Sequence, residues 1–125
     1  MIRFSIKSGN NSQKFDMPTD ELFDHLGSIR INEDIPITCS EKIHLDFYPT
    51  DDTDKIAMIV CERLLPDDKI SDVNQLCVKL DGLWRISAEE FESALSKENV
   101  YGALNIDAAY EKLRQEPLQT NDLSM

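Results

Sequence analysis

The spacing of the apolar residues changes part-way along the chain, and this change limits the possible folds more than any other feature. Apolar residues alternate with polar ones over residues 2–6 and 43–47, as in a strand with one buried face. Over residues 73–80 they instead follow the spacing of an amphipathic helix. We therefore expect an α+β fold, with a small N-terminal antiparallel sheet, short helices and a helical C-terminal half.

The first two strands are expected to pair as a hairpin. A strand over residues 2–6 leads into a turn at residues 8–12, where Gly and Asn tolerate positive φ. A returning strand follows over residues 13–17. Residues 43–47 give the clearest strand in the chain, and Pro49 is expected to end it.

A short helix is expected after the hairpin. Thr19 is placed to cap this helix, because a hydroxyl oxygen accepts a hydrogen bond from the free N–H groups of the first turn. We expect Leu22, Phe23 and Leu26 to form its apolar side. Gly27 is expected to end the helix in a left-handed conformation.

The middle of the chain is harder to assign. Residues 29–31 are expected to be extended. Residues 35–39 are expected to form an edge or irregular strand, because Pro36 has no N–H for a ladder hydrogen bond. Residues 54–65 fit either a buried strand or a helix. We favour the helix, because Asp precedes the segment as a cap and Pro follows it.

Three helices are expected in the second half. The first begins at Ser71 and ends at Gly82. The second starts with a capping box at residues 87–90, in which Ser and Glu each satisfy a backbone N–H. The last spans residues 106–115, and Pro117 is expected to stop it.

The chain is strongly acidic, with 24 acidic residues, 13 basic residues and a net charge of −11. Residues 16–72 hold 15 of the acids but only 5 of the bases, whereas residues 1–15 hold three bases and no acid. Helix capping explains single acids, because each acid near a helix N-terminus stabilises the helix by about 0.3–1 kcal/mol. It does not explain the scarcity of bases. We expect one acidic domain over residues 1–117 and a frayed tail over residues 118–125.

The sequence predicts neither an enzyme nor a metal protein. It contains no glycine-rich phosphate loop and no nucleophile elbow. His25 and His44 lie in no ligand spacing, and Cys39, Cys61 and Cys77 lack the close pairing of a zinc site. We expect three reduced, mostly buried thiols and no catalytic residue, cofactor or metal.

Other chemical patterns have simpler explanations. Residues 51–54 resemble the start of a calcium loop, but Lys55 and Ile56 stand where oxygen donors or the turn glycine belong. A thiol–imidazole pair of Cys39 and His44 is disfavoured, because nothing orients the histidine. The N-terminal residues lack the apolar stretch of a signal peptide, so we expect a cytoplasmic protein.

Residues 70–83, with the sequence ISDVNQLCVKLDGL, resemble a helix of the ArdA-type antirestriction proteins of conjugative mobile elements. Residues 15–27 and 91–95 are also similar to that family. The resemblance covers residues 13–113. It implies a DNA mimic whose surface carboxylates are arranged like phosphates and occupy the DNA-binding channel of a type I restriction enzyme.

The charge and the resemblance lead to one main hypothesis, a non-catalytic acidic inhibitor that blocks the nucleic-acid cleft of a host defence nuclease, either a restriction enzyme or a CRISPR effector. The expected partner is a basic DNA- or RNA-binding protein, with no direct binding to nucleic acid or membrane. A homodimer would lengthen the acidic row. The expected contact residues are Asp51, Asp52, Asp54, Asp67, Asp68 and Asp72, followed by Asp20, Glu21 and Asp24.

The alternative is a scaffold or adaptor protein of a mobile element. It would bind through an apolar patch near Leu83 and Trp84. A partly buried core anchor is the first interpretation of Trp84, and a partner contact is the second, because Trp is enriched at interface hot spots. Weak salt dependence of binding favours this alternative over the acidic inhibitor.

Overall fold

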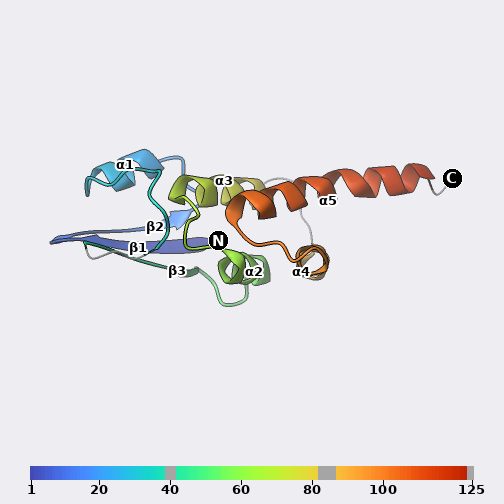
Figure 1. The fold of residues 1–125 in the computed structure, drawn as a ribbon, viewed down its shortest axis with the longest axis horizontal. Coiled ribbons are helices and arrows are strands. Elements are labelled where there is room, and N and C mark those ends of the chain that lie inside the picture. The colour runs from blue at the N-terminus through green and yellow to red at the C-terminus, as the bar shows by residue number, and fades with distance from the viewer. Residues whose placement is uncertain (39–41, 82–86, 124–125) are drawn as a thin grey trace.

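The computed structural model describes residues 1–38, 42–81 and 87–123, with residues 115–123 described by their backbone alone. The described residues form three strands and five helices, and the predicted α+β class is confirmed. The sheet occupies one end of the long axis, and most of the helices lie beside it (Figure 1). Leu83 and Trp84, which carry the adaptor hypothesis, and Cys39 lie outside the described residues.

The sheet is antiparallel, with the strand order β2-β1-β3. Alternation places one face of each strand in the core. Phe4 on the central strand lies opposite Phe15 on one side and Phe47 on the other, and its ring stacks on theirs at centroid distances of 6.0 and 5.6 Å. The strands are β1 (Ile2–Ser8), β2 (Asn11–Met17) and β3 (Ile43–Pro49).

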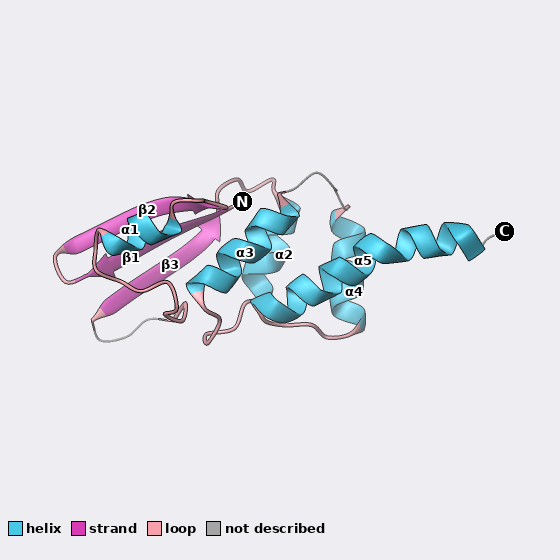
Figure 2. Ribbon diagram, turned by 90° about the horizontal axis from the view of Figure 1, so that it is seen from above, coloured by secondary structure: helices cyan, strands magenta, loops and turns pink. Residues whose placement is uncertain are grey.

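One helix covers the sheet, and the others pack beside the sheet and against one another. The first helix lies over the sheet, in contact with β2 (Figure 2). The second contacts β3, the third contacts β2, and the last packs against the third and fourth. They are α1 (Leu22–Gly27), α2 (Lys55–Arg63), α3 (Ile70–Leu80), α4 (Ala88–Lys97) and α5 (Ala103–Leu123).

One core joins the sheet to the helices. Phe4 in β1, Leu76 in α3 and Phe91 in α4 are all fully buried and belong to the same cluster. The buried Asn74 adds a polar link, because its side chain donates to the Thr19 carbonyl at 2.8 Å and accepts from the Thr19 N–H at 2.9 Å. α3 is therefore tied to the start of the segment that leads into α1.

Three details predicted for α1 are wrong. Phe23 is 72% exposed, because Leu22 and Leu26, one turn apart, already form the inward side of so short a helix. Thr19 accepts a hydrogen bond from the Glu21 N–H just before the helix, but the cap position itself belongs to Glu21. Gly27 is not left-handed; the positive φ, 61°, occurs at Arg30 instead.

The extended segments expected between residues 29 and 39 do not form strands in the described part of the chain. Residues 29–31 make turns back to the end of α1. Pro36 forms a single isolated bridge with Lys69. Pro36 and Lys69 are a non-hydrogen-bonded pair in this bridge, so the flanking residues make the bonds: the Ile37 N–H donates to the Asp68 carbonyl, and the Ile35 carbonyl accepts from the Ile70 N–H. Proline is tolerated here because this position needs no N–H. Thus the segment is pinned to the start of α3 without entering the sheet.

The predicted helix over residues 54–65 is confirmed as α2, and the Asp54 carboxylate accepts the Ala57 N–H at 3.0 Å as its cap. Half of the capping box of α4 is confirmed: the Ser87 hydroxyl accepts the Glu90 N–H at 3.1 Å, but the Glu90 carboxylate accepts from the Ser87 hydroxyl at 3.3 Å and not from a backbone N–H. α3 begins at Ile70, one residue before the predicted start.

The last helix is longer than predicted. It begins at Ala103, after Gly102 with φ of +97°, and it continues through Pro117 to Leu123. Proline costs a helix one backbone hydrogen bond and crowds the preceding turn, yet the turns on both sides of Pro117 form. The C-terminal part of α5 extends beyond the other elements (Figure 1), so no neighbouring element opposes a bend there.

Candidate functional site

The nine acids predicted as contacts lie at three places in the fold. They stand between β2 and α1 with Asp24 just inside the helix, between β3 and α2, and around the start of α3. Six of them are exposed and three are half-buried. The exposed residues are Asp20, Glu21, Asp24, Asp51, Asp52 and Asp67, and the half-buried ones are Asp54, Asp68 and Asp72.

Two of the half-buried acids hold the backbone. Asp54 caps α2, as described above. The Asp68 carboxylate accepts the Leu65 N–H at 2.7 Å and the Ala103 N–H at 3.0 Å, so it joins the α2–α3 connection to the first turn of α5. Both side chains add negative charge to the surface, but their main role is to accept hydrogen bonds from backbone N–H groups.

Asp51 is organised differently, because its carboxylate stays exposed. It accepts hydrogen bonds from the Thr53 N–H at 2.9 Å and the Thr53 hydroxyl at 2.7 Å. These bonds hold the pKa of Asp51 below its ordinary value, since they stabilise the ionised form. Asp51 therefore keeps a fixed negative charge at the loop that precedes α2.

None of the nine acids forms an ion pair with another described residue. The ion pairs lie elsewhere. Arg3 binds Asp16 on the sheet, and Lys79 lies 2.7 Å from both Asp107 and Glu111 in the contact between α3 and α5. Within the described parts of the chain, the predicted contact acids are thus not neutralised by lysine or arginine.

The fold brings a second acidic group toward the one at the start of α3. The Ser71 N–H first donates to the Glu33 carbonyl at 3.1 Å, which places the backbone of a further acidic residue beside the first turn of α3. At the second turn of the same helix, the bonds between Asn74 and Thr19 hold Asp20 nearby. The third group, at residues 51–54, lies at the other end of α2, whose nine residues span about 13 Å along the helix axis.

Sequence reasoning missed three exposed acids that gather between α2 and α4. Glu62 on α2 and Glu89 and Glu92 on α4 line one hollow. The helical phase of α2 already points Glu62 outward, away from the buried Val60. The approach of α4 depends on tertiary packing, which no local pattern of one sequence reveals.

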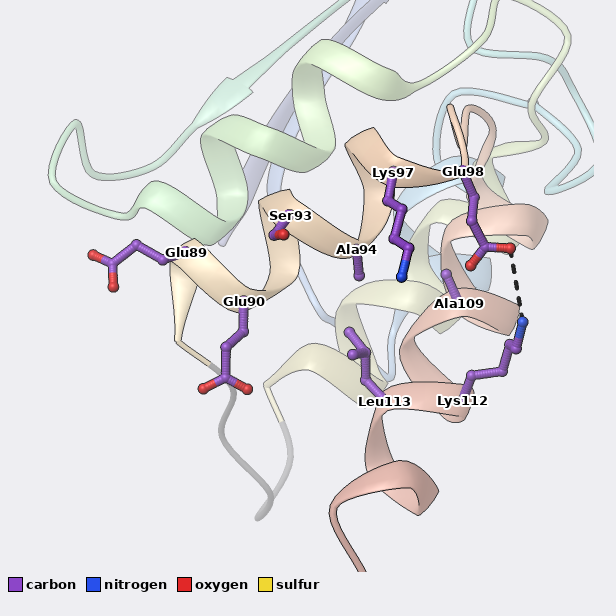
Figure 3. A pocket seen from close by; sticks show the side chains of 9 residues that line it. All are labelled: Glu89, Glu90, Ser93, Ala94, Lys97, Glu98, Ala109, Lys112 and Leu113. Carbon is purple, nitrogen blue, oxygen red and sulfur yellow. Dashed lines mark ion pairs between the residues drawn. The ribbon is translucent and has the colours of Figure 1, made fainter. Parts of the chain in front are cut away.

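A larger open groove, of about 770 Å³, lies between α4 and α5. Figure 3 shows Ala94, Ala109 and Leu113 along it, with the ion pair of Glu98 and Lys112, 3.7 Å apart, at one end. Its lining contains neither histidine nor cysteine.

The two described thiols have surroundings that keep them protonated. Burial, together with the charges of Asp54 and Glu62, raises the pKa of the Cys61 thiol to about 11, and burial raises that of Cys77 to about 12. Both thiols are therefore protonated at neutral pH and poor nucleophiles. The described residues contain no cluster of three or more His, Cys, Asp or Glu side chains suited to a metal ion.

No protein-family model matches the chain, and no curated protein or solved structure matches it significantly. The resemblance to the ArdA-type proteins therefore stays a prediction. Among the helices that the structure describes, none is both long enough and apolar enough to cross a membrane.

Proposed function

We propose that this protein is a non-catalytic acidic inhibitor that occupies the basic nucleic-acid-binding cleft of another protein. The partner is a host defence nuclease, either a restriction enzyme or a CRISPR effector, and the compartment is the cytoplasm. The observation that carries the proposal is the set of predicted contact acids without an ion pair among the described residues. Unneutralised carboxylates attract a surface built to bind phosphates.

The number of carboxylates is sufficient for this role. B-form DNA carries about one negative charge per 1.7 Å of its axis. A domain of this length has a radius of gyration of about 14 Å and therefore a diameter of roughly 30 Å. A DNA duplex of that length carries roughly 18 negative charges. The chain has 24 acidic residues, and a homodimer would extend the row.

The three acidic groups have different roles in the proposal. Asp51, Asp52 and Asp67 are exposed and substitute for phosphates directly. Asp20, Glu21 and Asp24 form a second contact region on the segment that includes α1. The half-buried acids, Asp54, Asp68 and Asp72, add to the field that steers a cationic cleft toward the protein.

The test is displacement of a fluorescent DNA duplex from a type I restriction enzyme and from CRISPR effectors. We expect displacement at low salt and a steady loss of apparent affinity as salt rises, because exposed charges are screened. The triple variant Asp51→Asn, Asp52→Asn, Asp67→Asn is expected to bind at least about tenfold more weakly, which corresponds to about 1.4 kcal/mol.

The matched control neutralises three acids outside the predicted set, with Asp46→Asn, Asp81→Asn and Glu98→Gln, and has the same net charge as the triple variant. It is expected to retain most of the wild-type affinity. Absence of displacement from every nuclease at low salt contradicts the proposal. Salt-insensitive binding that is lost in Trp84→Ala supports the adaptor alternative instead.

A further inference from the structure

Met58 is exposed at the centre of the outward side of α2. This helix buries Ala57 and Val60 and turns Lys55, Met58 and Glu62 toward solvent. These three residues are three and four positions apart, so they form one stripe along the helix. Met58 keeps 40% of its surface exposed, and charged side chains border it on both sides along the stripe.

A hollow of about 310 Å³ separates this side of α2 from α4. The apolar part of its lining, which we call its floor, consists of Met58, the half-buried Ala88 and the buried Ile59. Exposed carboxylates from both helices complete the lining, with Glu62 on α2 and Glu89 on α4. Glu89 lines both this hollow and the groove that α4 forms with α5 (Figure 3).

A second hollow, also of about 310 Å³, continues on the other side of Met58 toward the connection between β3 and α2. It shares Met58 and Glu62 with the first hollow and adds the apolar surfaces of Pro49 and Cys61. Asp52 stands at its edge. The two hollows thus form one surface, which we call the Met58 groove.

The charge of the Met58 groove is one-sided. Asp52, Glu62, Glu89 and Glu92 line it and form no ion pair among the described residues, and Lys55 is the one cation in the lining. An occupant therefore needs positive charge for the edges and an apolar side chain for the floor. A partner that is bound by mimicry of a DNA duplex needs the positive charge but not the apolar side chain.

We propose that the Met58 groove binds a cationic amphipathic helix of a partner protein. Such a helix presents an apolar stripe bordered by Lys and Arg on both flanks, which matches an apolar floor with carboxylates on both sides. An extended strand would turn alternate side chains away from the groove. The flexible thioether of Met58 adapts to different apolar side chains, and helix-in-groove binding uses anchors one turn apart.

This inference goes beyond the proposed function, because it requires no phosphate-like arrangement and holds for any partner with such a helix. The probe is a fluorescent synthetic peptide of about 14 residues, or about four helical turns, with Leu on one face and Lys on the other. A scrambled peptide of the same composition keeps the charge but loses the apolar face. Binding is measured by fluorescence anisotropy at physiological salt.

We expect the amphipathic peptide to bind wild type at least about tenfold more tightly than the scrambled peptide. Met58→Gln is expected to weaken binding about tenfold. The matched control is Leu104→Gln, which changes another exposed apolar residue, 64% exposed on α5 and outside the groove, and leaves binding unchanged. Glu62→Gln combined with Glu89→Gln is expected to weaken binding, whereas Asp24→Asn is not.

Three results overturn the proposal: no binding of the amphipathic peptide, equal binding of the scrambled peptide, or equal effects of Met58→Gln and Leu104→Gln. The nuclease displacement assay is separate. A failure in the peptide assay with intact displacement removes the groove but leaves the inhibitor proposal standing. Displacement that is absent while the peptide binds at the groove removes the inhibitor proposal alone.

Discussion

The outward face of the sheet and the outward side of α2 are both exposed, but they carry charge in different ways. On the sheet, Arg3 and Asp16 are direct cross-strand partners joined by hydrogen bonds of 2.6 and 3.2 Å. Beside α2, Asp52 and Glu62 flank Met58 and have no ion-pair partner among the described residues. The fold thus neutralises Asp16 on the sheet and leaves Asp52 and Glu62 beside α2 unneutralised by the described residues.

This difference shows what the net charge alone conceals. A role limited to solubility would be served by acids spread over the whole surface, because self-repulsion is smallest when like charges are far apart. One base at the end of α2, Arg63, is used elsewhere: it donates to the Val100 carbonyl and to Ser96, and it lies over the ring of Tyr101.

The largest expected effect tests whether the sheet and the helices share one core. Phe4→Ala in the sheet and Phe91→Ala in α4 each remove a fully buried ring. We expect each variant to lose about 3–5 kcal/mol of unfolding free energy and to unfold in a single transition. Denaturant unfolding followed by two probes checks this. Two separate transitions, of which each variant shifts only one, would show that the regions fold independently.

The next effect concerns the polar link between α3 and the segment that leads into α1. Asn74→Ala leaves the N–H and carbonyl of Thr19 without the side chain that satisfies both. We expect a loss of about 1–3 kcal/mol in the unfolding free energy. The exposed neighbour Gln75 provides the control, since Gln75→Ala is expected to change stability by less than about 0.5 kcal/mol. Equal losses in the two variants would contradict the link.

A smaller effect separates structural acids from exposed ones within the same loop. Asp54→Ala removes the cap of α2 and is expected to cost about 1 kcal/mol. Asp52→Ala removes an exposed carboxylate and is expected to change stability by less than about 0.5 kcal/mol. Thermal unfolding at neutral pH measures both. A cost for Asp52→Ala as large as that for Asp54→Ala would refute this division of roles.

The smallest effect is expected on the sheet. The hydrogen bond and charge of Arg3 hold the pKa of Asp16 below its ordinary value of 3.8. A carboxyl whose pKa is lower in the folded state stabilises the fold above its unfolded pKa and loses this contribution as the pH falls through the folded pKa. Because the pair is exposed, Asp16→Asn should cost less than about 1 kcal/mol at neutral pH.

The same stability difference, measured by denaturant unfolding across a falling pH series, should shrink as the pH drops below 3.8 and vanish once Asp16 is protonated in the folded protein as well. A difference that stays constant over the whole acid series would mean that the side chain acts through packing and not through its charge.

Local patterns were sufficient for most elements of the fold. The alternation in β1 and β3, the Asp54 cap and the Ser87 cap are set by nearby residues, and the structure confirms each of them. Local patterns failed where packing decides. Phe23 has the spacing of a core residue in a longer helix, but α1 has only six residues and leaves it exposed.

The candidate site could be predicted less well from the sequence than the fold. The sequence indicated that the acids outnumber the bases, but not which acids serve the backbone. Asp68 satisfies an N–H that lies 35 residues further along the chain. Likewise, Glu62 and Glu89 line one hollow only because α4 packs beside α2. These relations depend on contacts between distant segments, which a single sequence does not specify.

The most direct test of the central claim compares two variants of equal net charge. Asp51→Asn with Asp52→Asn removes unpaired charges before α2, and Asp16→Asn with Asp46→Asn removes charges from the sheet. For each, the salt dependence of DNA displacement from a sensitive nuclease is measured. The account predicts a shallower salt slope and weaker binding for the first variant, with the second close to wild type. Equal changes in both variants would contradict it, because net charge alone would then explain binding.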